Sequence, residues 1–164
     1  MLLDLKKVFS DREESCSFDY LLDLSSTDIN GYHPFVSPVK VRGTVKGQDG
    51  FAQLNAEVSF EFSIPCDRCT KQIDKCYHYT FWHTLVLSLE NEDDVSYVEV
   101  PDYQLDLDEL IRADILLELP YKYLCSDDCK GLCPSCGKNL NDGTCDCDFH
   151  QIDPRLEALK KLID

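Results

Sequence analysis

The chain has 164 residues, of which 43% are hydrophobic, so it can fold around one core with a small appendage at most. Its formal net charge at pH 7 is −15, which disfavours binding of nucleic acid by the surface as a whole. The first residues lack the pattern of a signal peptide, and no apolar run has the length of a membrane span. We therefore expect a cytoplasmic protein without membrane contact, whose ten cysteines indicate metal or redox chemistry rather than disulfides.

The first hundred residues consist mainly of segments with strand character. The apolar segment at 2–9 predicts a strand, and apolar and polar residues alternate over 16–24 as in a half-buried strand. Cys16 lies on the apolar phase of that alternation, so we expect it in the core. A further strand at 73–89 follows the same rule of period two.

Residues 39–45 and 51–64 predict a β-hairpin around a four-residue loop at 47–50. With that loop, Lys46 would face Phe51, and the apolar residues of both strands would share one face. The other face would pair Arg42 with Asn55 and Lys40 with Glu57.

This other face carries the best basic stripe in an acidic chain: Lys40, Arg42 and Lys46. Arg68 lies in the turn at the far end of the second strand and could extend the stripe. Three or four cations in a row are candidate RNA contacts. A strand face that is simply solvated accounts for the same pattern.

A helix is predicted from about Leu107 to Pro120, with Asp106 as its N-cap. Its apolar residues Leu110, Ile111 and Ile115 would pack on the sheet. The predicted fold is thus α+β: a bent, mostly antiparallel sheet or open barrel with one packed helix, then a cysteine-rich zinc segment and a short terminal helix. We expect two parts, a β-rich core domain at 1–120 and the zinc segment with the C-terminal helix at 121–164.

The cysteine-rich segment holds six cysteines within residues 125–147. Four thiolates fit around one zinc ion as a tetrahedron. Two closely spaced pairs separated by turn-forming residues therefore predict one zinc ion, bound by Cys133, Cys136, Cys145 and Cys147. Pro134 stiffens the first of these turns, and Gly137 can take the positive φ needed to leave it.

Another pair, Cys66 and Cys69, occupies a turn between two predicted strands and leaves two interpretations open. It can be a pair of free thiols, or half of a second zinc site completed by Cys125 and Cys129. A thioredoxin-like redox role fits less well, because that motif starts a helix whereas strand-like sequence resumes here.

Six motifs follow one another along the chain: Cys66-Asp-Arg-Cys69, Leu105-Asp-Leu-Asp-Glu-Leu-Ile111, Leu119-Pro120, the segment 129–141, Cys145-Asp-Cys147 and Asp153-Pro-Arg-Leu156. Taken in this order, they resemble the YceD family of large-subunit ribosomal RNA accumulation proteins, in its cysteine-rich branch, and the resemblance covers nearly the whole chain.

The resemblance implies a bacterial cytoplasmic factor that supports normal levels of large-subunit ribosomal RNA and has no catalytic activity. The sequence agrees, since it contains no nucleophile with an adjacent base and no phosphate-binding glycine loop. The expected partner is large-subunit ribosomal RNA or a precursor particle. Two alternatives remain: an acidic module that holds a basic ribosomal protein, and a thiol redox protein.

Overall fold

The computed structural model describes residues 1–10, 14–88 and 97–147, and the account below concerns these residues. The chain divides into two compact units, one of residues 1–64 with 72–122 and one of residues 65–71 with 123–164. Whether a domain boundary falls at residue 120 stays a prediction. In the described ranges, no helix has both the length and the apolar character needed to cross a membrane.

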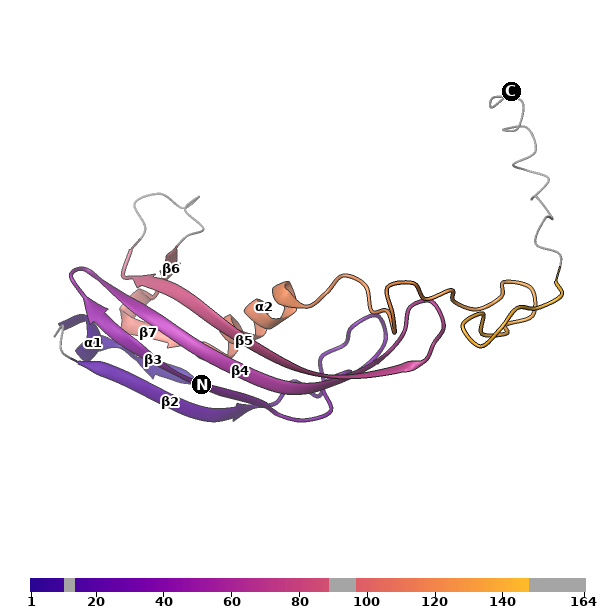
Figure 1. Ribbon diagram of the computed structural model, residues 1–164. Helices are drawn as coiled ribbons and strands as arrows, with labels where there is room; N and C mark the ends of the chain where they lie inside the picture. The colour runs from indigo at the N-terminus through magenta and orange to yellow at the C-terminus, as the bar shows by residue number, and fades with distance from the viewer. Residues whose placement is uncertain (11–13, 89–96, 148–164) are drawn as a thin grey trace, which may run out of the picture. The chain divides into compact units, whose positions relative to one another are not determined.

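The first unit is built on a five-stranded open sheet with the order β2 (Ser15–Leu22), β3 (Val39–Gln48), β4 (Phe51–Pro65), β5 (Gln72–Val86) and β6 (Tyr97–Glu99) (Figure 1). β3 pairs antiparallel with β2 and β4, whereas β6 runs parallel to β5. A second sheet pairs β1 (Leu2–Asp4) with β7 (Gln104–Asp106) in antiparallel sense. With the helices α1 (Lys6–Ser10) and α2 (Leu107–Glu118), and a 3-10 turn at Pro101–Tyr103, this confirms the predicted α+β class with a mostly antiparallel sheet.

The hairpin of β3 and β4 has a different register from the predicted one. Gln48 pairs with Phe51, so the connection is the two residues Asp49 and Gly50 rather than four. Gly50 has a φ of 79°, a conformation that glycine adopts without strain and that lets so short a loop close. The prediction was therefore wrong by two residues: Arg42 faces Glu57, and Lys40 faces Ser59. Because the side-chain period of a strand is also two, the predicted faces are unchanged.

The core lies against one face of this sheet. Buried residues alternate with half-buried or exposed ones along the whole of β4, and Val39, Val41 and Val45 are buried on the same face of β3. Cys16, predicted in the core, is only half-buried. A Cβ at Gly43 would lie 2.6 Å from the ring of Phe18 on β2 and 2.0 Å from the backbone oxygen of Asn55 on β4. Glycine is therefore needed for β3 to approach its two neighbouring strands at this point.

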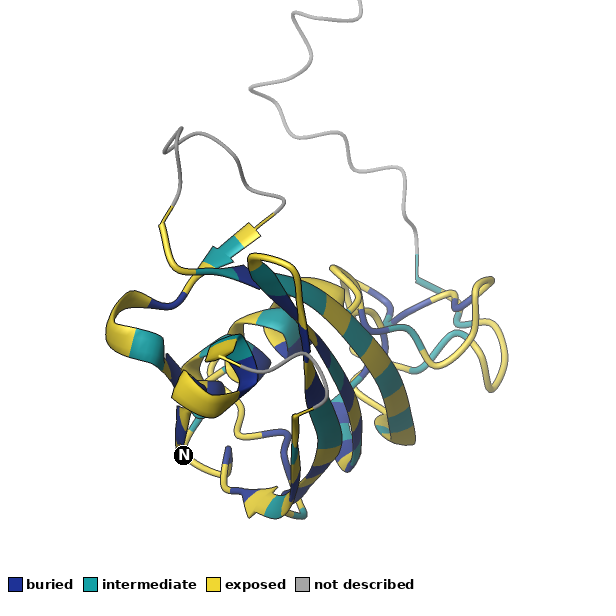
Figure 2. Cartoon of the chain, turned by 90° about the vertical axis from the view of Figure 1, so that its left-hand side faces the viewer, coloured by how far each residue is buried: buried dark blue, intermediate teal, exposed yellow. Residues whose placement is uncertain are grey.

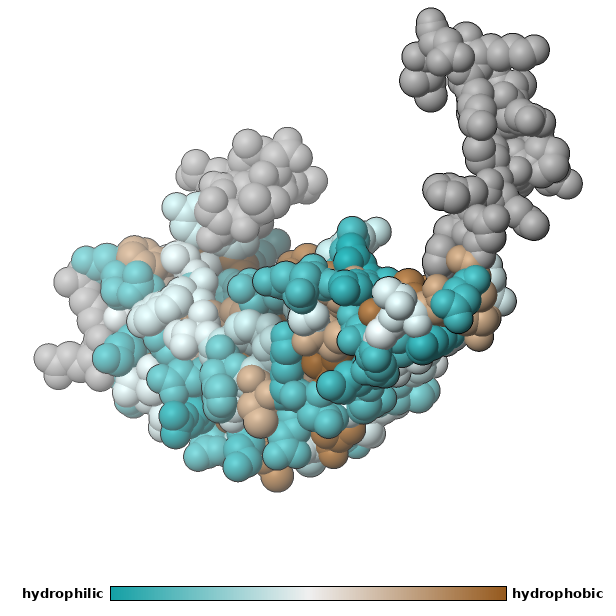
Figure 3. All heavy atoms as spheres, turned by 45° about the vertical axis from the view of Figure 1, so that its right-hand side comes forward, coloured by the Kyte–Doolittle hydropathy of each residue, from teal (hydrophilic) through white to brown (hydrophobic). Residues whose placement is uncertain are grey.

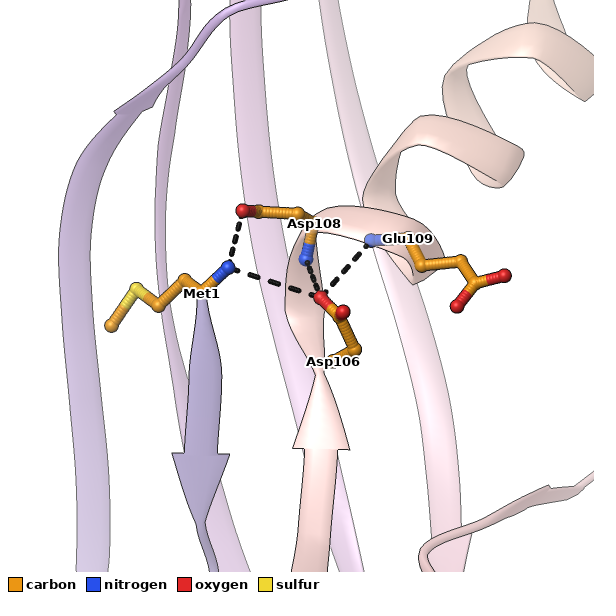
Figure 4. A network of polar contacts seen from close by, with 4 residues as sticks. All are labelled: Met1, Asp106, Asp108 and Glu109. Carbon is orange, nitrogen blue, oxygen red and sulfur yellow. Dashed lines mark hydrogen bonds and ion pairs between the residues drawn. The ribbon is translucent and has the colours of Figure 1, made fainter.

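Helix α2 lies on the concave side of the bent sheet (Figure 2). Its N-cap is Asp106, whose carboxylate accepts hydrogen bonds from the backbone N–H groups of Asp108 and Glu109, as predicted (Figure 4). The amino group of Met1 also lies against the carboxylates of Asp106 and Asp108. The helix buries Leu107, Ile111 and Ile115, and a hydrogen bond of 2.8 Å between His83 Nε2 and Asp114 Oδ2 connects it to β5. Leu110, predicted in this contact, is half-buried.

The predicted strand at 2–9 is interrupted. β1 ends at Asp4, and its carboxylate accepts a hydrogen bond of 3.0 Å from the N–H of Lys6, at the start of α1. The apolar residues Leu5, Val8 and Phe9 have helical spacing, and the first two of them are buried. The predicted terminal helix lies outside the described residues.

Candidate metal centres and the basic strand

The first cysteine group joins two segments of the second unit. Cys66 and Cys69 lie in the turn after β4, where the N–H of Thr70 donates to the carbonyl oxygen of Cys66 at 2.9 Å. Cys125 and Cys129 come from the segment after α2. Asp67 binds the two segments together, since its N–H donates to the Tyr123 carbonyl oxygen and its carboxylate accepts the Tyr123 N–H, both at 2.8 Å.

The geometry of this group suits one ion. The four sulfur atoms all lie within 4.8 Å of one another, and Cys66, Cys69 and Cys129 are buried. The sulfur of Cys66 is 3.8 Å from that of Cys129, and the sulfurs of Cys69 and Cys125 are 3.5 Å apart. A tetrahedron with zinc–sulfur bonds of about 2.3 Å has sulfur–sulfur edges of about 3.8 Å. The four residues thus fit around a single tetrahedral metal ion.

The second group consists of Cys133, Cys136, Cys145 and Cys147, whose sulfur atoms also lie within 4.8 Å of one another. A tight turn brings the first two together: the N–H of Gly137 donates to the Cys133 carbonyl oxygen at 2.9 Å, and the N–H of Cys136 donates to the Cys133 sulfur at 3.3 Å. Gly137 leaves this turn with a φ of 73°, which confirms the conformation expected for it. The two four-cysteine groups could each hold a metal ion.

The electrostatics of each group favour a bound cation. Burial alone would raise the pKa of the Cys66 thiol. Hydrogen bonds from backbone N–H groups, of which that of Cys69 has the largest effect, lower this pKa to about 6. Cys133 has the same balance of burial and backbone N–H groups, and its pKa is also about 6. In contrast, hydrogen bonding to Cys129 raises the pKa of Cys125 to about 12. Four thiolates therefore do not coexist freely at neutral pH, whereas a divalent cation would neutralise much of their charge.

The basic stripe lies on the exposed face of β3, beside a groove of about 440 Å³ that Lys40, Arg42 and His78 help to line. Arg42 is flanked by two acidic residues, Asp19 on β2 and Glu57 on β4, and its Nη2 lies 2.8 Å from Glu57 Oε2.

The other two cations of the stripe have no acidic residue directly opposite. Lys40 pairs with Leu21 and Ser59, and Lys46 pairs with Ser15 and Gln53.

Arg68 has a contact within the second unit. Its Nη1 donates to the carbonyl oxygen of Cys129 at 2.8 Å, and its own carbonyl oxygen accepts the N–H of Leu132 at 3.1 Å. Arg68 thus helps to hold the first cysteine group together, and its predicted role in RNA contact stays a prediction.

Two residues that support the cysteine groups through hydrogen bonds could not be identified from the sequence. Asp67 gave no signal beyond its place between two cysteines. Asn141 could be recognised only as a turn former, yet its side-chain amide donates to the Cys129 sulfur at 3.3 Å. Such contacts join residues from separate segments, and sequence spacing does not reveal them.

Comparison with known proteins identifies relatives of this chain. It is 30% identical to YlbN of Bacillus subtilis over 159 residues, which cover 92% of this chain and 90% of YlbN. It is 39% identical to Rv2926c of Mycobacterium tuberculosis over 72 residues, 44% of this chain and 33% of that protein. No solved structure matches the chain.

Two further findings concern proteins with a functional description. The chloroplastic large ribosomal RNA subunit accumulation protein YCED homolog 1 of Arabidopsis thaliana is 36% identical over 59 residues, 36% of this chain and 18% of that protein. The profile of the family described as large ribosomal RNA subunit accumulation protein YceD matches residues 54–163, which include both cysteine groups. This chain therefore belongs to the YceD family.

Proposed function

We propose that this protein is a non-enzymatic ribosome biogenesis factor of the bacterial cytoplasm, which supports accumulation of large-subunit ribosomal RNA by binding that RNA or a precursor particle. The family description connects the chain with large-subunit ribosomal RNA and names no enzymatic activity. The observation that supports a direct RNA contact is the exposed face of β3, where Lys40 and Lys46 have no acidic residue directly opposite.

Zinc is the ion that we propose for both cysteine groups. Thiolate is a soft ligand, and four thiolates without a histidine or an open position are typical of closed, structural zinc sites. A reducing cytoplasm would keep the eight thiols available for the metal. The ions would then hold the second unit in shape and take no part in a reaction.

The RNA contact would be small. With three or four cations, the slope of log affinity against log salt for single-stranded RNA would be about −2 to −3. Arg42 would contribute least, because Asp19 and Glu57 flank it. Such weak binding would become specific only on a ribonucleoprotein particle, where a ribosomal protein adds a second contact.

The excess of acidic residues in the chain supports a second candidate function, a module that holds a basic ribosomal protein. The chain has 31 acidic and 16 basic residues. Figure 3 shows one face of the molecule, on which hydrophilic side chains predominate. On this alternative, binding would require the carboxylates and would survive nuclease treatment.

The test is a folded triple variant, Lys40→Glu, Arg42→Glu and Lys46→Glu, in a strain that lacks the wild-type gene. We expect it to lose cosedimentation with large-subunit precursors and to leave ribosomal RNA levels low. A matched control, Lys6→Glu, Lys7→Glu and Lys75→Glu, makes the same change in net charge at exposed residues that do not belong to the stripe. The control should behave like wild type.

If the stripe variant cosediments and restores ribosomal RNA as well as wild type does, β3 is not the RNA contact. The protein-binding function then takes first place. A pull-down from extract with and without nuclease measures it directly, since only a protein partner would remain after nuclease.

A further inference from the structure

Asn141 belongs to the loop of one cysteine group, but its side chain reaches the other. It lies between Cys136 and Cys145, two cysteines of the second group. Its Nδ2 donates to the sulfur of Cys129, in the first group, at 3.3 Å. One side chain thus connects the two groups.

The orientation of this amide is fixed by its other partners. Asn141 Oδ1 accepts the N–H of Lys130 at 2.8 Å, and Nδ2 also donates to Asn139 Oδ1 at 2.8 Å. The flipped amide would place its oxygen against the sulfur and against another acceptor oxygen, and its NH₂ group against an N–H donor. Asn141 therefore acts as a donor to the Cys129 thiolate.

The loop that carries Asn141 is held against the segment between the two groups. Leu132 and Asn139 form an antiparallel bridge, and the N–H of Leu140 donates to the Gly131 carbonyl oxygen at 2.9 Å. The loop starts at Cys136 and ends at Cys145, so an ion in the second group would fix both of its ends. Metal binding there would therefore place Asn141 at the first group.

We propose that Asn141 is a positioning residue that couples the two cysteine groups, so that an ion bound in the second group raises the affinity of the first group for its own ion. This inference rests on the proposed zinc sites. An N–H donor spreads the charge of a ligating thiolate and fixes its direction, and partners of this kind typically change metal affinity by about tenfold to a hundredfold.

The test uses the full-length, zinc-loaded chain and the variant Asn141→Asp, which removes both amide donors and places a carboxylate beside the thiolate. The matched control is Asn139→Asp, which adds the same charge two residues away and keeps the oxygen that accepts from Asn141. Competition with a chelator, followed by alkylation and mass spectrometry of each cysteine, gives the zinc affinity of each group. Asn141→Ala, which adds no charge, is a second variant with the same expected direction of change.

We expect Asn141→Asp to weaken zinc at the first group by about tenfold to a hundredfold, while Asn139→Asp stays near wild type. Removing the second site with Cys145→Ser and Cys147→Ser should weaken the first group as well, and adding Asn141→Asp should then have little further effect. The coupling would be overturned if Asn141→Asp and Asn139→Asp left the first group with equal zinc affinity, or if the effect of Asn141→Asp persisted in full without the second site. The proposed zinc sites would stand in either case. A wild-type chain that binds fewer than two zinc ions would overturn both.

Discussion

Each of the two units of this protein is stabilised internally by a different kind of interaction. The first unit buries an apolar face of its sheet together with Leu107, Ile111 and Ile115 of α2. In the described part of the second unit, the buried side chains are those of Tyr123 and four cysteines, Cys66, Cys69, Cys129 and Cys133. The first unit can thus gain stability from the hydrophobic effect, whereas the described part of the second unit buries too little apolar surface to fold by that means.

The difference predicts which treatment unfolds which unit. Removal of metal by a strong chelator should have the largest effect, because a structural zinc ion contributes roughly 10–16 kcal/mol at pH 7. We expect the segment 123–147 to lose protection from amide hydrogen exchange, while β3 and β4 keep theirs. Persistent protection of 123–147 in protein shown to be metal-free by elemental analysis would mean that the second unit has another source of stability.

Ile111→Asp should break the first unit and leave the cysteine groups able to bind metal. The side chain of Ile111 is 0% exposed, so the substitution removes apolar packing and buries a carboxylate without a partner. We expect a loss of more than about 4 kcal/mol in the free energy of unfolding, measured with denaturant.

Leu117→Asp is the matched control for that substitution, because Leu117 is on the same helix and is 86% exposed. It should change the stability by about 0.5 kcal/mol or less. Similar losses for the two variants would show that α2 does not contribute to the core through Ile111.

Asp106→Ala should have a smaller effect on the first unit. It removes the acceptor for the N–H groups of Asp108 and Glu109, and loss of an N-cap typically costs about 1 kcal/mol. Asp106→Asn keeps an acceptor oxygen and should recover most of the loss in thermal unfolding experiments. If Asn destabilises the protein as much as Ala does, the charge of Asp106 matters more than its cap.

Local signals in the sequence predicted part of this structure. The start of α2 followed from Asp106, and the alternation along β3 and β4 predicted their faces, because capping and strand period are properties of neighbouring residues. The register of the hairpin was predicted wrongly, since apolar alternation is the same for a loop of two residues and a loop of four. The helix α1 was missed because a short apolar segment suits a strand as well as a helix.

The cysteine groups show the same limit. The spacing of Cys133, Cys136, Cys145 and Cys147 was sufficient to predict one group, because all four lie close together in the chain. The partnership of Cys66 and Cys69 with Cys125 and Cys129 stayed open, since it depends on where the chain returns after more than fifty residues. Contacts such as that of Asn141 with Cys129 depend on this return as well.

The first cysteine group has a consequence for chain topology. It joins residues that are 56 and 63 positions apart in the chain. An ion bound there would therefore act as a crosslink and close a chain loop that contains β5, β6, β7 and α2. A crosslink that closes a loop of this length lowers the entropy of the unfolded chain by an amount worth about 4 kcal/mol at room temperature. The loop can close only after residue 129 has been synthesised, so the paired β3 and β4 would leave the ribosome well before the ion completes the fold.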